Sequence, residues 1–188
     1  QGTVKADNAA ATSEFGEPSS ASQVAGKSVW WHYRPDADGL LALSTEASSI
    51  DAVLGLYLGS CVTNLPLVAS SDNADAGVAS GRIRQAVRAL ETYRILVDGR
   101  LGRSGMFNLS FSFTPMSVFR LSVSNTAGGS VAPRSGPYVR NERVMIVAAP
   151  ESNYQFDSWD GPIISRENPL TIVMTNDAAL FAKFRPYP

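Results

Sequence analysis

The chain has 188 residues, of which 44% are hydrophobic and 18% are charged, enough apolar material for one large domain or two small ones. Sixteen Lys and Arg stand against seventeen Asp and Glu, for a net charge of −1, and this balance disfavours a nucleic-acid binder or a polybasic membrane anchor. The single cysteine, Cys61, excludes an intrachain disulfide, and no apolar run approaches the roughly 18 residues of a membrane span.

The first 26 residues are small and polar. They contain no charged and then apolar signal segment, so we expect a mature chain or a piece of a longer, multidomain one. Their composition leaves two structures open, a loose leading segment or a leading edge strand.

Short apolar runs separated by turn residues come next. They predict strands at residues 28–34, 39–45, 52–58, 67–69, 92–98 and 106–113. Residues 82–93 fit both helical spacing and alternation, and Gly81 before them favours a strand. Turn residues recur every 8 to 12 positions or so, which is typical of a β-sandwich rather than of βαβ units.

The pattern restarts after Thr114-Pro115-Met116. A turn at Gly128-Gly129 and strands at 118–124, 143–149, 154–159, 170–174 and 179–184 follow. We therefore predict an all-β protein with a jelly-roll-like β-sandwich at 1–115 and a small β-rich repeat module at 116–188.

Alternation along the predicted strands also selects a core for each domain. In the first domain it consists of Val29, Trp31, Leu41, Leu43, Val53, Leu56, Ile95, Val97, Phe107, Leu109 and Phe111. In the second it consists of Leu121, Val123, Val144, Ile146, Phe156, Ile172 and Phe184.

Several segments of the first domain match a known pattern in order: 27–31 (KSVWW), 49–59 (SIDAVLGLYLG), 92–99 (TYRILVDG) and 105–113. They resemble the pre-peptidase C-terminal β-sandwich of secreted bacterial proteins. The sequence departs from that pattern at Asn73, where a second Asp is common, and at Glu91, where Gly is usual.

The second domain contains 127–131 (AGGSV), 135–138 (SGPY) and 154–161 (YQFDSWDG). These segments resemble the divergent InlB-type bacterial repeat. Both families occur as accessory modules of large secreted or cell-surface proteins, and neither is itself catalytic. The resemblance therefore implies a secreted or cell-surface module with a binding or spacer role.

Residues for catalysis are scarce. His32 is the one histidine, so a Ser-His-Asp triad must use it, and it lies within a predicted strand beside two tryptophans. The sequence contains no P-loop, no HExxH and no CxxC. We expect the protein not to be an enzyme.

Carboxylates suggest one possible cofactor, calcium. Asp72, Asn73 and Asp75 place three side-chain oxygens within one loop, and Ca²⁺ takes six to eight oxygen ligands. Related collagen-binding modules hold calcium near their N-terminal segment, and by that analogy Glu17 joins the set. The alternative is that these side chains cap a solvated loop.

Aromatic side chains are the best indication of binding, because flat rings stack on the C–H faces of sugars. Trp30, His32 and Arg34 share the more polar face of their strand. This composition fits a sugar platform, and it equally fits a tryptophan covered by the leading segment. Trp159 presents the same choice between a ligand contact and the core anchor of its repeat.

Arg82, Arg84 and Arg88 form an alternating row. Such a row suits an anionic polymer, since a guanidinium matches carboxylate geometry. The alternatives are a solvated sheet face and protection of an edge strand.

These observations favour a non-catalytic module that binds polysaccharide through its first domain. Two other functions stay open. One is a protein-binding or adhesin segment or a protease C-terminal module, with an extracellular-matrix or cell-surface protein as partner. The other is a structural spacer without a ligand. Nucleic acid is not expected as a partner.

Overall fold

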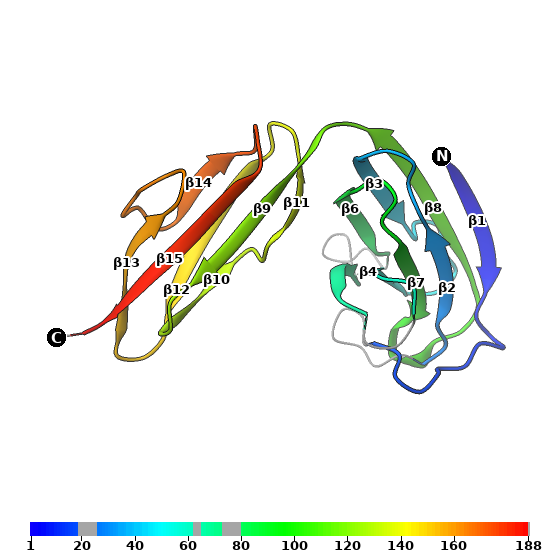
Figure 1. Ribbon diagram of the computed structural model, residues 1–188. Coiled ribbons are helices and arrows are strands. Elements are labelled where there is room, and N and C mark those ends of the chain that lie inside the picture. The colour runs from blue at the N-terminus through cyan, green and yellow to red at the C-terminus, as the bar shows by residue number, and fades with distance from the viewer. Residues whose placement is uncertain (19–25, 62–64, 73–79, 188) are drawn as a thin grey trace. The chain divides into compact units, whose positions relative to one another are not determined.

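The computed structural model describes residues 1–18, 26–61, 65–72 and 80–187. It divides into two compact units, Gln1–Pro115 and Met116–Pro188 (Figure 1). Within the described residues there are fifteen strands and one short 3-10 helix, Arg100–Gly102, so the predicted all-β class is confirmed. The described ranges hold no helix with the length and apolar character needed to cross a membrane.

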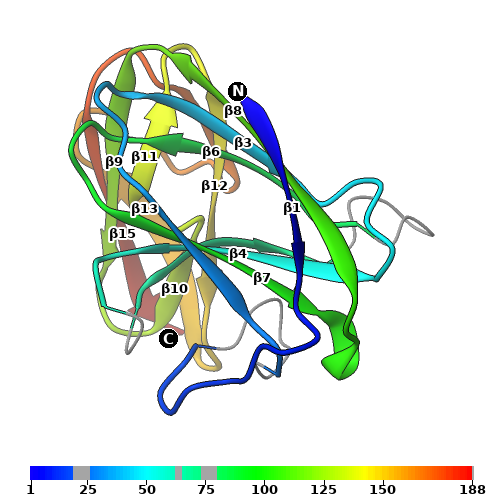
Figure 2. The ribbon, with the colours of Figure 1, turned by 90° about the vertical axis from the view of Figure 1, so that its right-hand side faces the viewer.

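Unit 1 consists of two four-stranded antiparallel sheets. One has the order β1 (Gly2–Asp7), β8 (Met106–Pro115), β3 (Gly39–Ser44), β6 (Arg82–Val87). The other has the order β2 (Val29–Tyr33), β7 (Tyr93–Gly99), β4 (Ala52–Leu58), β5 (Leu67–Ser71). Figure 2 separates the two layers, with β3 and β6 above β4 and β7.

Strand pairing in unit 1 is nested. β1 pairs with β8, β2 with β7, β3 with β6 and β4 with β5. A long antiparallel ribbon rolled up in this way places alternate pairs in opposite sheets, which is the jelly-roll arrangement. The first residues of the chain therefore form the edge strand β1 beside β8, one of the two structures that their composition left open.

The core of unit 1 lies between its two sheets. Leu41, Leu43, Ile95, Phe107 and Leu109 are buried there as predicted. Trp31 packs at the rim, edge-on to Phe107 at 5.9 Å between ring centroids.

One predicted core residue of unit 1 is buried on the other face of its strand. Val53 is buried, but it alternates with Leu54 and Leu56, whose side chains fill the space between the sheets. Val53 therefore faces the other side of β4. Because six of the seven residues of β4 are buried, the sequence of this strand carries no alternation from which its faces can be read.

Unit 2 has a three-stranded and a four-stranded sheet. The first has the order β10 (Gly129–Ala132), β12 (Arg143–Pro150), β14 (Leu170–Val173). The second has the order β11 (Gly136–Val139), β9 (Val118–Asn125), β15 (Ala178–Pro186), β13 (Tyr154–Asp160). β9 and β15 run parallel, and the other pairs are antiparallel.

The predicted core of unit 2 is confirmed. Leu121, Val144, Ile146, Ile172 and Phe184 are buried in one cluster, and Val123 and Phe156 pack against it. Strands β10 and β11 were not predicted. They are four residues long, and their sequences, GSVA and GPYV, contain the glycine, serine and proline that usually indicate a turn.

Candidate functional site

Trp30 lies on the outward face of the β2-β7-β4-β5 sheet. Its neighbours Val29, Trp31 and Tyr33 pack against the core of unit 1, so the predicted division of β2 into two faces is correct. The Trp30 ring is half-buried and packs against Tyr57, with 5.5 Å between ring centroids.

A carboxylate from the leading segment holds this tryptophan in place. Glu17 Oε1 accepts a hydrogen bond from Trp30 Nε1 at 3.1 Å, and Glu17 Oε2 accepts one from Ser28 Oγ at 2.6 Å. Leu65 and Leu96 complete a small apolar cluster around Tyr57 and Trp30. This is the arrangement expected for a tryptophan covered by the leading segment, the second of its two predicted roles.

His32 and Arg34 are both exposed. Arg34 Nε donates to the backbone oxygen of Leu90 at 2.9 Å, which directs the guanidinium toward the turn before β7. Trp30 is thus engaged with Tyr57 and Glu17, and Arg34 with a neighbouring turn.

Trp159 requires a correction. Its side chain is 0% exposed at the centre of unit 2, 5.2 Å from Phe156 between ring centroids. Its indole Nε1 donates to the backbone oxygen of Glu167 at 2.9 Å. A fully enclosed ring has no face for a sugar, so the ligand-contact hypothesis for Trp159 is wrong and this residue is the core anchor of unit 2.

The predicted calcium ligands are distributed over different environments. Asp72 Oδ2 lies 3.5 Å from Arg100 Nε, and both carboxylate oxygens of Glu17 accept hydrogen bonds. Asn73 and Asp75 lie outside the described residues. In the part of the chain that the structure describes, no three His, Cys, Asp or Glu side chains group together as a metal site would require. Calcium stays a prediction.

The arginine row leads to a groove on the outer face of the β1-β8-β3-β6 sheet. Ile83 is buried, and Arg82 and Arg84 on either side of it are exposed. Arg88 lies beyond the end of β6, where its backbone N–H donates to the Tyr93 hydroxyl at 3.0 Å. The exposed row on the strand therefore has two arginines, not three.

Strand register places small polar residues beside these arginines. Ser44 of β3 lies opposite both Arg82 and Ser110, and Ser110 lies opposite Thr3. In the adjacent cross-strand row, Ala42 lies opposite both Arg84 and Ser112. Two parallel rows of small side chains thus cross the sheet, and each ends at an arginine on β6.

A concavity of about 490 Å³ lies over these rows, and we call it the arginine groove. Its walls include Thr3, Ser44, Arg82, Arg84, Ser110 and Ser112. Small side chains in the middle of the sheet leave the surface low there, and the long arginines border it.

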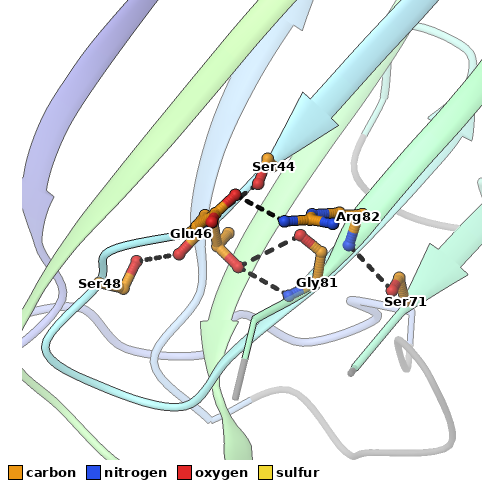
Figure 3. A network of polar contacts seen from close by, with 7 residues as sticks. Ser44, Glu46, Ser48, Ser71, Gly81 and Arg82 are labelled. Carbon is orange, nitrogen blue, oxygen red and sulfur yellow. Dashed lines mark hydrogen bonds and ion pairs between the residues drawn. The ribbon is translucent and has the colours of Figure 1, made fainter. Parts of the chain in front are cut away.

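Figure 3 shows how one arginine of the groove is fixed. Arg82 Nη2 lies 2.7 Å from Glu46 Oε2, and the backbone N–H of Glu46 donates to Ser44 Oγ at 3.1 Å. Arg84 has no carboxylate within 4.0 Å among the described residues. Its guanidinium keeps its five donors for an anion.

Comparison with known families gives a match to the second domain. The family model of the divergent InlB B-repeat domain matches residues 119–188, nearly all of unit 2. The predicted resemblance of the second domain is therefore confirmed, and it suggests an extracellular accessory module of bacterial type. A comparison with curated proteins gives no match to this chain. The resemblance of unit 1 to the pre-peptidase C-terminal domain stays a prediction.

Proposed function

We propose that the protein is a non-catalytic accessory module of a secreted or cell-surface bacterial protein, and that unit 1 binds an acidic polysaccharide along the arginine groove. The observation that carries this proposal is Arg84, which has no carboxylate partner among the described residues and lies next to Arg82 at the border of a floor of hydroxyls. The match of unit 2 to an extracellular repeat family supports the location.

The chemistry of the groove fits an anionic sugar chain. A guanidinium donates two parallel hydrogen bonds to a carboxylate or a sulfate. The hydroxyls of Ser44, Ser110 and Ser112 both donate and accept, as sugar hydroxyls do. An open groove admits a polymer along its length, whereas an enclosed pocket accepts only a chain end.

A non-catalytic role is supported by the position of the one histidine. His32 is exposed on β2, and the arginine groove belongs to the other sheet of unit 1. No general base of this type therefore faces a polymer in the groove.

Affinity electrophoresis tests this proposal. The whole protein is run in gels that contain polygalacturonate, alginate or a sulfated glycan, each with calcium and with a chelator. We expect retardation in at least one gel, about tenfold weaker affinity for Arg84→Ala, and a loss of retardation as salt is raised, because exposed ion pairs are screened.

Arg166→Ala is the matched control, since it removes one exposed arginine of unit 2 and changes the net charge equally. Equal weakening by both substitutions would indicate a non-specific charge effect and contradict the groove. Retardation that requires calcium would support the predicted cofactor, and none in any gel would refute acidic-polysaccharide binding.

A second candidate function has an observation of its own. Met145, Val147 and Val173 are 59%, 36% and 45% exposed on β12 and β14 of unit 2. Exposed apolar side chains on one sheet favour a protein partner. A pull-down with collagen and other matrix proteins tests this adhesin-type function, and Met145→Ser is expected to weaken any capture.

A further inference from the structure

The outer face of the four-stranded sheet in unit 2 carries one aromatic ring in a hollow. Leu180 and Ala182 of β15 are buried in the core, so Phe181 between them points to the opposite side of the sheet. It is half-buried there. A hollow of about 450 Å³ surrounds it, and we call this the Phe181 groove.

The ring is accessible because its neighbours are small. Ser124 of β9 and Asp160 of β13 lie directly opposite Phe181 in the strand register. Ser122 lies opposite Ala179, two residues before the ring. None of these side chains is long enough to cover a phenyl ring from a neighbouring strand.

Gly161 shapes one end of the Phe181 groove. Its φ of +126° is a conformation that side-chain-bearing residues rarely adopt, and a Cβ at this position would lie 2.3 Å from the Ala179 oxygen. The turn after β13 can therefore approach β15 only with glycine, and this approach sets Asp160 beside the ring.

The carboxylate in the groove is fixed and ionised. Asp160 Oδ2 lies 2.7 Å from Lys183 Nζ, and Asp160 Oδ1 accepts a hydrogen bond from the Gly161 N–H at 3.0 Å. The Lys183 ammonium and this N–H both lower the pKa of the Asp160 carboxyl. The Asp160 side chain is 47% exposed, so its carboxylate is able to accept further hydroxyl donors.

From these contacts we propose that the Phe181 groove binds one sugar ring of a neutral polysaccharide. The C–H face of the sugar stacks on Phe181, and its hydroxyls donate to Asp160 and exchange hydrogen bonds with Ser122 and Ser124. An apolar floor with a few fixed polar groups at its side is the usual composition of a small-ligand site. This site is independent of the arginine groove of unit 1.

The surroundings select a neutral sugar rather than a peptide or an anion. β9 and β15 are the two inner strands of their sheet, so no free backbone edge is available here for an added peptide strand. The two cations that β15 carries on this face are paired, Lys183 with Asp160 and Arg185 with Asp157. A phosphate or uronate stacked on Phe181 would lie beside the Asp160 carboxylate, and Lys183 is already paired with that carboxylate.

Affinity electrophoresis of the whole protein in hydroxyethylcellulose, laminarin and galactomannan gels tests the site. We expect wild type to be retarded in at least one gel, largely independent of salt. Phe181→Ala should weaken that binding about tenfold or more, because an aromatic anchor carries a large share of a small interface. Phe181→Tyr should retain it.

Phe15→Ala is the control, since it removes a fully exposed phenyl ring from unit 1. If Phe181→Ala lowers the thermal stability, its loss of binding could come from a damaged unit 2. Ser124→Leu then tests the site, because a branched side chain at this exposed position covers the Phe181 ring and leaves it in place.

No retardation in the three gels, or wild-type binding by Ser124→Leu, would overturn the Phe181 site. Loss of neutral-polymer binding in Arg84→Ala but not in the Phe181 variants would assign that binding to unit 1 and also overturn it. Loss of acidic-polymer binding alone concerns the arginine groove and leaves this inference intact.

Discussion

Trp30 and Trp159 are the same residue type with the same satisfied indole N–H, and the fold uses them differently. Trp159 is enclosed by the core of unit 2, and its hydrogen-bond acceptor is a backbone carbonyl. Trp30 lies on an outer sheet face, and its acceptor is a carboxylate of the leading segment. Trp159 is held by the packing of the whole unit, whereas Trp30 is held by a small apolar cluster and by one carboxylate thirteen positions earlier. The difference shows that an aromatic ring near polar residues can be structural in two unrelated ways.

The strongest test of this comparison is Trp159→Ala. Removing a fully buried indole leaves a cavity and one unpaired carbonyl, and we expect a loss of about 3–5 kcal/mol in the stability of unit 2. Hydrogen exchange of the amides in β13 and β15 measures it. A loss below about 1 kcal/mol would contradict the role of core anchor.

Trp30→Ala should cost less, about 2 kcal/mol, because the ring is only half-buried and the cavity opens to solvent. Urea denaturation followed on unit 1 measures the change. Binding of an acidic polysaccharide should be unaffected in the folded variant. Weaker binding without a loss of stability would support the sugar-platform hypothesis for Trp30.

Glu17→Gln tests whether the charge of the carboxylate contributes to holding Trp30. It keeps the shape of the side chain and removes its charge, and we expect about 1 kcal/mol of lost stability from weaker hydrogen bonds to Trp30 and Ser28. A double-mutant cycle with Trp30→Phe isolates the coupling between the two side chains. Strict additivity would mean that Glu17 does not hold the tryptophan.

The last prediction concerns the hydroxyl of Tyr93 in unit 1, whose ionisation has the smallest effect on stability at neutral pH. Burial, with the Glu91 carboxylate, raises the pKa of the Tyr93 hydroxyl well above its ordinary value of 10. The unfolded state therefore loses this proton first, and the contribution of Tyr93 to stability is constant below about pH 10 and falls above it. Tyr93→Phe should reduce that alkaline slope in chemical denaturation, and an unchanged slope would contradict the shift.

Most of the strands could be predicted from the sequence because one face of each strand is more buried than the other. Buried residues alternate with half-buried ones in β3 and with exposed ones in β12, and this pattern can be read without a structure. In β4 both faces are covered, and the position of Val53 could not be inferred. The residues of β10 and β11 do not indicate strands by themselves, and these segments are extended because they pair with β12 and β9.

The candidate sites, too, could be predicted only as far as residues of a single strand reveal them. Arg82 and Arg84 were identified because their alternation lies within one strand. The serines beside them come from β3 and β8, and only the register across strands brings them together. Phe181 was read as part of a strand, and nothing local indicates that its neighbours at positions 124 and 160 leave it accessible. The analogy with collagen-binding modules assigns Glu17 to calcium, whereas in the structure its carboxylate accepts hydrogen bonds from Trp30 and Ser28.

The nested pairing of unit 1 has a consequence for how this unit is made. Its outermost pair joins Gly2 to Phe111 and Asp7 to Met106, so the first strand finds its partner only after about a hundred further residues have been synthesised. Closing so long a loop costs conformational entropy before any contact repays it, which makes folding slow. The roll therefore stays open while residues 8–105 are being synthesised, and it closes only once β8 is free to join β1.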